Sequence, residues 1–190
     1  ERISANSKRL LSLINDFLDL SRIESGRMEL VSEPISPNTF TERVYKQMSA
    51  LAENKRLTFV TSVDPDLPST IYGDEEALSK IVINLVGNAI KFTSAGSVEM
   101  NVRSCGDQWS IEVSDTGIGI PPHAREFIFD EFRQVDSTSK REFGGTGLGL
   151  AIVQKLTRMM GGQVQLESEV GKGSKFTVLL PVQSNVTSLN

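Results

Sequence analysis

The chain has 190 residues, of which 38% are hydrophobic, and carries a formal net charge of −4. This length suits one domain of ordinary size with an appendage, and the hydrophobic fraction is sufficient for a core. The acidic balance makes nucleic acid a poor candidate partner. The sequence shows neither a membrane-spanning apolar run nor a secretory signal. Its single cysteine, Cys105, excludes an internal disulfide and fits a reducing compartment.

Residues 1–25 predict a helix that ends at Ser25-Gly26. Spacings of three and four residues alternate along one stripe, which consists of Ile3, Asn6, Leu10, Leu13, Phe17, Leu20 and Glu24. Leu11, Ile14 and Leu18 widen it beyond what a solvated helix needs. The helix is therefore expected either to dock on its own domain or to form one arm of a dimerising hairpin. Because the chain begins without Met inside this pattern, we interpret it as a piece of a longer protein.

The remaining elements follow from apolar periodicity and from capping or turn residues. Strands are expected at 28–35, 57–63, 71–72, 97–103, 109–114, 163–168 and 175–180. Helices are expected from an Asn38 cap to about Asn54, from an Asp74 cap to about Phe92, from Pro121 to about Asp130, and over 148–160. The second helix should turn Phe40, Val44, Met48 and Leu51 inward. This order predicts an α+β fold, a two-layer sandwich with a mixed sheet and helices on one face, preceded by the N-terminal helix.

Two glycine-rich segments, Asp115–Ile120 (DTGIGI) and Gly144–Leu150 (GGTGLGL), follow the asparagine-containing helix Asn84–Thr93. Glycine lets the backbone approach a ligand closely and adopt positive φ. Glycines 145, 147 and 149 flank a helix start, where backbone N–H groups bind phosphate. The pattern is neither a Walker A loop nor a dinucleotide fingerprint. Together the three segments predict a nucleotide site.

Asn84, Asn88 and Lys91 lie on one stripe of their helix. Amide oxygens suit Mg²⁺, which keeps waters and shares phosphate ligands, and Lys91 offers a positive charge to a phosphate. Alternatively, the asparagines are buried and satisfied by neighbouring backbone. Asp115 forms a simple Asx turn, or it accepts a hydrogen bond from the adenine amino group and so selects ATP over GTP. His123 is expected at the surface, and no Cys/His cluster indicates zinc.

These segments resemble the motifs of sensor histidine kinases of two-component signalling, within the ATPase superfamily of gyrase-type topoisomerases, heat-shock chaperones and mismatch-repair proteins. In chain order, 84–93 resembles the N box, 115–120 the first glycine box, 129–132 the F box, 145–150 the second glycine box and 171–176 a third. Residues 13–24 resemble the second helix of the dimerisation and phosphotransfer hairpin. The resemblance implies a partial hairpin at 1–27, a catalytic ATP-binding domain at 28–183 and a tail at 184–190.

The resemblance also implies roles for individual residues. Asn88 would be the main Mg²⁺ ligand with Asn84 in support, and both would act with Lys91 as the catalytic set. Residues 133–146 would form a lid over the nucleotide. The implied nucleotide-binding residues are Asn84, Asn88, Lys91, Phe92, Asp115, Gly117, Gly119, Ile120, Arg133, Lys140, Arg141, Gly145, Thr146, Gly147, Leu148, Gly149 and Thr177.

The implied activity is transfer of the ATP γ-phosphoryl group to a histidine, for relay to an aspartate of a response regulator receiver domain. The implied setting is a homodimer formed through the hairpin, either cytoplasmic or as the cytoplasmic part of a membrane-anchored sensor. The family places its acceptor histidine in a Ser-His-Glu-type box on the first hairpin helix, and this sequence has no such box. We therefore expect the chain to bind ATP without phosphorylating itself.

Two other functions compete with this one. A gyrase- or chaperone-type ATPase or clamp would carry a glutamate base four residues before the Mg²⁺ asparagine, whereas Asn84 stands there and cannot take a proton. A non-catalytic interaction module would use the N-terminal helix alone and would not bind nucleotide.

Overall fold

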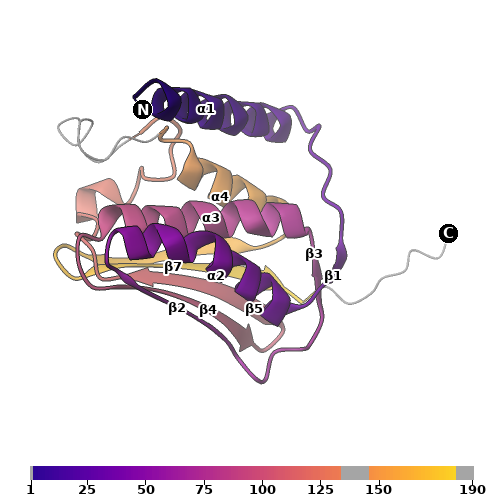
Figure 1. The fold of residues 1–190 in the computed structure, drawn as a ribbon. Coiled ribbons are helices and arrows are strands. Elements are labelled where there is room, and N and C mark those ends of the chain that lie inside the picture. The colour runs from indigo at the N-terminus through magenta and orange to yellow at the C-terminus, as the bar shows by residue number, and fades with distance from the viewer. Residues whose placement is uncertain (1, 134–145, 183–190) are drawn as a thin grey trace.

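A computed structural model describes residues 2–133 and 146–182 (Figure 1). The helices are α1 (Arg2–Glu24), α2 (Pro37–Asn54), α3 (Glu75–Phe92) and α4 (Gly149–Met159), with a 3-10 turn η1 (Pro122–Ala124). The strands are β1 (Glu33–Ile35), β2 (Thr58–Val63), β3 (Ile71–Gly73), β4 (Ser97–Cys105), β5 (Gln108–Asp115), β6 (Gln163–Glu169) and β7 (Gly173–Pro181).

The main sheet has five strands in the order β2-β4-β5-β7-β6. β2 runs parallel to β4, and the other neighbours are antiparallel, so the sheet is mixed. Helices α2, α3 and α4 cover one of its faces (Figure 1). Alternate residues of β5 explain this arrangement, because Trp109, Ile111 and Val113 are buried beneath the helices. The predicted α+β sandwich with helices on one face is confirmed.

The central helix, α3, begins as predicted. Asp74 is its N-cap, and the side chain accepts a hydrogen bond from the backbone N–H of Ala77 at 2.7 Å. Its apolar stripe is buried between the sheet and the neighbouring helices, and comprises Leu78, Ile81, Val82, Leu85 and Ile90. Because this stripe is buried, the polar residues of α3 lie along its half-buried edge, which carries Asn84, Asn88 and Lys91.

The structure corrects the predicted start of α2. The N-cap is Ser36 rather than Asn38, and its hydroxyl accepts a hydrogen bond from the backbone N–H of Thr39. Pro37 then occupies the first helical position, where its missing N–H costs nothing and its fixed φ suits the helix. Leu51, expected inward, is 46% exposed.

Two other predicted elements are shorter than expected. Of the strand predicted at 28–35, only β1 forms, because its partner β3 is equally short and the N–H of Val31 donates to the Asp74 carboxylate instead of to a strand. Of the helix predicted from Pro121 to Asp130, only η1 is helical, and isolated turns follow it.

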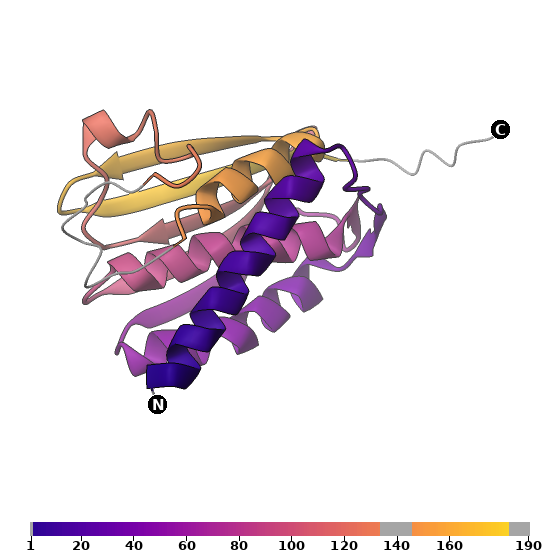
Figure 2. The same cartoon turned by 90° about the horizontal axis from the view of Figure 1, so that it is seen from above.

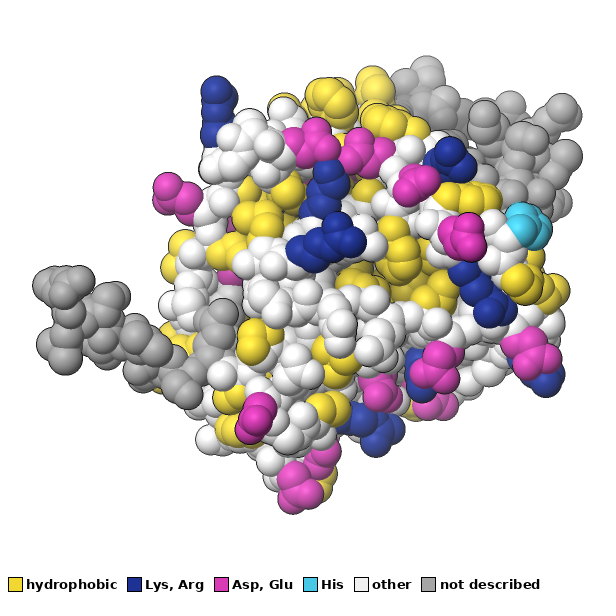
Figure 3. All heavy atoms as spheres, turned by 180° about the vertical axis from the view of Figure 1, so that it is seen from behind, with side chains coloured by type: hydrophobic (Ala, Val, Ile, Leu, Met, Phe, Trp, Pro, Cys, Tyr) yellow, Lys and Arg dark blue, Asp and Glu magenta, His cyan; other side chains and the backbone are white. Residues whose placement is uncertain are grey.

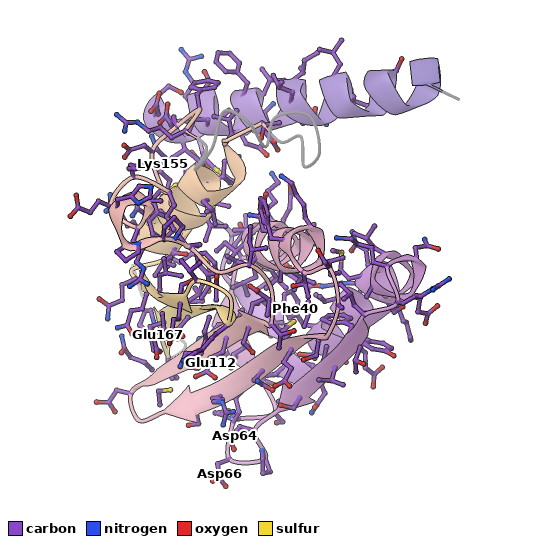
Figure 4. The ribbon with its side chains drawn as sticks, turned by 90° about the vertical axis from the view of Figure 1, so that its left-hand side faces the viewer. Phe40, Asp64, Asp66, Glu112, Lys155 and Glu167 are labelled. Carbon is purple, nitrogen blue, oxygen red and sulfur yellow. The ribbon has the colours of Figure 1, made fainter. Side chains whose placement is uncertain are left out.

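Helix α1 crosses over α4 and α3 (Figure 2). Polar contacts join it to the domain: Asp19 pairs with Lys80 of α3 at 3.1 Å, and Glu24 pairs with Lys155 of α4 at 2.5 Å. Lys155 also pairs with Glu131 at 2.9 Å, and it lies at the junction of α4 and α1 in Figure 4. The helix is therefore docked on its own domain, which is one of the two expected arrangements.

The docking leaves much of the apolar stripe of α1 uncovered. Leu20 is buried, but five large apolar side chains are exposed to between 45% and 61%: Leu10, Leu11, Ile14, Phe17 and Leu18. Figure 3 shows apolar side chains along the edge of the molecule where α1 lies. The dimerising hairpin therefore stays a prediction compatible with the docked helix. No helix in the described part of the chain is long and apolar enough to cross a membrane.

Candidate nucleotide-binding site

The end of α3 and the first glycine segment pack directly against each other. The N–H of Ile118 donates to the carbonyl of Phe92 at 3.3 Å. A Cβ added at Gly117 would lie 2.5 Å from that carbonyl oxygen and 2.9 Å from the hydroxyl of Thr93. Glycine is therefore required at 117 by the close approach of the helix end. The two segments that the sequence pattern assigned to one site are adjacent in space.

Asp115 ends β5 on the face of the sheet that the helices cover. Its Oδ1 accepts the N–H of Gly117 at 2.8 Å, which is the Asx turn expected as one alternative. Burial raises the pKa of Asp115, and hydrogen bonds from the backbone of Gly117 and Ser174 act in the opposite direction. A carboxylate has further lone pairs, so the turn does not exhaust its capacity to accept. The Asx turn and an adenine acceptor are compatible.

Ser174 lies beside Asp115 and was not among the predicted residues. The two are paired in the β5–β7 ladder, and Ser174 is 8% exposed. Its hydroxyl is 2.9 Å from that of Ser168, which accepts the N–H of Ile120 at 2.7 Å. Antiparallel pairing of β5 with β7 could have indicated this residue, because it places the last residue of β5 opposite the residue after Gly173.

Thr177, by contrast, does not lie beside Asp115. It is opposite Glu112, and its neighbours Phe176 and Val178 are the residues that β7 buries beneath the helices. Because side chains alternate along a strand, Thr177 faces the other side of the sheet. The structure separates it from Asp115 and from α3.

The asparagines of α3 differ in their surroundings. Asn84 donates from Nδ2 to the carbonyl of Lys80 at 2.8 Å, and its Oδ1 would lie 2.5 Å from a Cβ added at Gly149. Gly149 is thus a glycine because the first turn of α4 presses against Asn84. Asn88 is half-buried, and its side chain makes no hydrogen bond with any residue of 2–133 or 146–182. Among the described residues, backbone therefore satisfies the amide nitrogen of Asn84 but not the side chain of Asn88.

The described residues hold no group of three or more His, Cys, Asp or Glu side chains that could bind a metal. The amide oxygen of Asn88, which no described residue engages, still fits Mg²⁺, because this ion takes few protein ligands and retains waters and phosphate oxygens. Three residues further along α3, the Lys91 ammonium lies 4.5 Å from the centre of the Phe92 ring. An amide oxygen, a cation and an aromatic face therefore share the last turns of α3.

The second glycine segment is described from Thr146 onward. The cap residue of α4, Leu148, makes no side-chain cap hydrogen bond, and its N–H donates to the hydroxyl of Thr146 at 3.2 Å. An uncapped helix start exposes N–H groups that favour an anion. The same Thr146 hydroxyl lies 3.1 Å from a carboxylate oxygen of Asp16, so α1 touches this segment. Gly147 has a φ of +73°.

The F box and the third glycine segment complete the surroundings. The N–H of Phe132 donates to the carbonyl of Gly147 at 3.1 Å. A Cβ at Gly119 would lie 2.1 Å from the carbonyl oxygen of Glu169 at the end of β6. The N–H of Gly171 donates to the carbonyl of Ile118 at 2.8 Å, so the first and third glycine segments also touch. Arg133 pairs with Asp130 at 3.5 Å. The predicted residues Lys140, Arg141 and Gly145, and most of the predicted lid, lie outside the described residues.

Comparisons with known proteins show which proteins this chain resembles. Residues 73–184 match the family described as "Histidine kinase-, DNA gyrase B-, and HSP90-like ATPase". The sensor histidine kinase RcsC of Escherichia coli (strain K12) is 41% identical over 177 residues, which cover 93% of this chain and 19% of that protein. The circadian input-output histidine kinase CikA of Synechococcus elongatus is 39% identical over 184 residues, covering 96% of this chain and 24% of that protein. The chain thus spans a quarter or less of these relatives.

Solved structures are also similar. Full-length ShkA in complex with AMPPNP superposes with a TM-score of 0.85 at 36% identity, covering 95% of this chain and 37% of that one. The Acinetobacter baumannii histidine kinase AdeS superposes with a TM-score of 0.77 at 23% identity, which supports the fold alone.

Proposed function

The chain belongs to the histidine kinase-, DNA gyrase B- and HSP90-like ATPases, as a catalytic ATP-binding domain of the sensor histidine kinase type, and from this premise we propose how its residues act. The domain transfers the γ-phosphoryl group of ATP to a histidine on a hairpin helix, and the group passes on to a receiver-domain aspartate. Residues 1–27 are the partial hairpin, 28–183 the catalytic domain and 184–190 a tail. The longer protein is a homodimer whose kinase domain works in the cytoplasm.

The hydrogen bonding and packing of the Asn84 side chain favour a kinase over a hydrolytic ATPase. A hydrolase of this superfamily would need a general base one helical turn before Asn88. Asn84 stands there instead, with its nitrogen bonded to the carbonyl of Lys80 and its oxygen against Gly149. An amide held in this way cannot take a proton from water. Phosphoryl transfer to a positioned histidine needs no such base from the domain.

The chain's own residues have distinct roles in this proposal. Asn88 would hold Mg²⁺ through its amide oxygen, and the ion would offset the negative charge of the triphosphate. Lys91 adds a point charge, and the uncapped start of α4 after Leu148 provides backbone donors to phosphate. Asp115 accepts from the adenine amino group, and Phe92 offers an aromatic face to the base. Phosphoryl transfer depends mainly on such positioning and charge stabilisation.

Nucleotide titration tests the proposed function. Calorimetry with Mg²⁺ should detect ATP binding and a much weaker response to GTP, because guanine presents a carbonyl where adenine presents an amino group to Asp115. A buried acceptor that loses its donor costs about 1–3 kcal/mol, or roughly 5- to 150-fold in affinity. Equal affinities for ATP and GTP would contradict the adenine assignment. Absence of all nucleotide binding would favour a non-catalytic interaction module.

A second prediction concerns self-phosphorylation. The 190-residue chain incubated with ATP should form no phosphohistidine, because its one histidine, His123, is an exposed residue of η1 rather than part of an acceptor helix. A longer protein that includes an upstream helix with a Ser-His-Glu-type box should acquire an acid-labile label. The label should vanish when that histidine is replaced by glutamine. Stable labelling of the present chain at His123 would refute the assignment of the acceptor.

A further inference from the structure

The C-terminal end of α3 is held by a side chain from a different helix. Lys55, the residue that caps α2, donates from Nζ to the carbonyls of Ile90 at 2.7 Å, Lys91 at 2.8 Å and Thr93 at 3.0 Å. Lys55 is half-buried, and α2 lies beside α3 (Figure 1). Every N–H donor of the ammonium group can thus meet a carbonyl of one helix end.

This contact completes the hydrogen bonding of the helix end. The carbonyl of Ala89 accepts from the N–H and hydroxyl of Thr93, and that of Phe92 accepts from the N–H of Ile118. Thr93 leaves the helix in an extended conformation, with φ of −100° and ψ of 123°. Without a left-handed residue to fold the chain back, the remaining carbonyls need partners from elsewhere. Lys55 supplies them and also opposes the negative end of the helix dipole.

The helix end held by Lys55 is the part of α3 assigned to nucleotide. Lys91 and Phe92 belong to the bonded turn, and Asn88 belongs to the turn before it. The first glycine turn rests on the same end, because Gly117 has no room for a Cβ against the Phe92 carbonyl. A shift of this end would move the metal ligand, the phosphate cation and the Asp115 turn together.

We propose that Lys55 is a positioning residue of the nucleotide site, which fixes the end of α3 relative to the first glycine turn without touching ATP. The inference rests on the proposed function, since it concerns the same site. Small displacements of binding groups by remote changes lower affinity and rate strongly. The ammonium group acts here through backbone carbonyls and not through a phosphate.

Three variants of Lys55 and one control variant of Lys46 test the role of Lys55. Lys55→Met keeps the aliphatic stem and removes the donors, and it should raise the Kd for Mg²⁺-ATP by about tenfold. Lys55→Arg keeps charge and donors and should stay within about threefold of the original Kd. Lys46→Met removes an exposed charge from the same helix and should leave the Kd unchanged. Lys55→Gln, which keeps an amide donor, should give an intermediate Kd and replaces Lys55→Met if that variant does not fold.

A stability control separates positioning from folding. Ile35→Ala removes a side chain that is 2% exposed and packs near Gly73, at the opposite end of α3. It should lower the melting temperature but leave the Kd for ATP unchanged when measured below its transition. A Lys55→Met protein that melts earlier but binds ATP with the original Kd would overturn the proposal, as would an equal loss in Lys46→Met. Failure of the unaltered chain to bind ATP would instead refute the proposed function itself.

Discussion

Asn88→Ala is expected to slow phosphoryl transfer to a histidine-bearing upstream helix by roughly 10²- to 10³-fold, the range for loss of one preorganised charge-stabilising group. It should also remove the Mg²⁺ dependence of ATP binding, because Asn88 is the proposed magnesium ligand. The half-buried Asn88 amide has no hydrogen-bond partner in the described chain and so is available for the ion. The fold should survive, since alanine favours a helix more than asparagine does. Transfer of radiolabelled phosphate and calorimetry with and without Mg²⁺ measure the two effects.

The matched control is Asn38→Ala, which removes an exposed amide from α2 and should change neither property. Asn84→Ala should have a smaller effect than Asn88→Ala, because the Asn84 nitrogen is engaged by the carbonyl of Lys80. If Mg²⁺ still strengthens ATP binding by the Asn88→Ala variant, another residue holds the metal.

Asp115→Asn is expected to weaken ATP binding by about 1–3 kcal/mol, because a charged acceptor is replaced by a group that can present a donor to the adenine amino group. Folding stability should change in the opposite direction. Burial holds the pKa of Asp115 above its ordinary value, so the ionised carboxylate destabilises the folded state at neutral pH. The amide oxygen of asparagine can still accept the N–H of Gly117. The variant should therefore melt at a higher temperature at neutral pH.

The sign of the pH dependence follows from the raised pKa. As the pH falls through the folded-state pKa of Asp115, the carboxyl of the unaltered chain becomes neutral and its penalty disappears. The difference in melting temperature between the two proteins should therefore shrink on acidification. Thermal unfolding at neutral and acidic pH checks this, with Asp107→Asn in the exposed β4–β5 turn as the control. A variant that loses both ATP affinity and stability would contradict the account.

The sequence by itself predicts the elements whose signals are local. The Asp74 cap and the apolar stripe of α3 involve residues within a few positions of one another, and alternation defines the β4–β5 hairpin. The order of the motifs likewise indicates a nucleotide site near α3. The boundaries of helices are harder to predict where neighbouring residues could each act as the cap. Helix α2 begins after Ser36 and Pro37, although Asn38 is also a good N-cap residue.

Only the tertiary structure decides which residues meet across long sequence separations. It brings Ser174 beside Asp115 and turns Thr177 to the other face, because strand register determines the face of every side chain. It shows that Gly149 accommodates Asn84 and that Lys55 holds the end of α3. The sequence around Lys55 does not indicate that its ammonium group will donate to the carbonyls of a different helix. Such contacts arise from the packing of α2 and α3 on one sheet, which no local pattern in the sequence encodes.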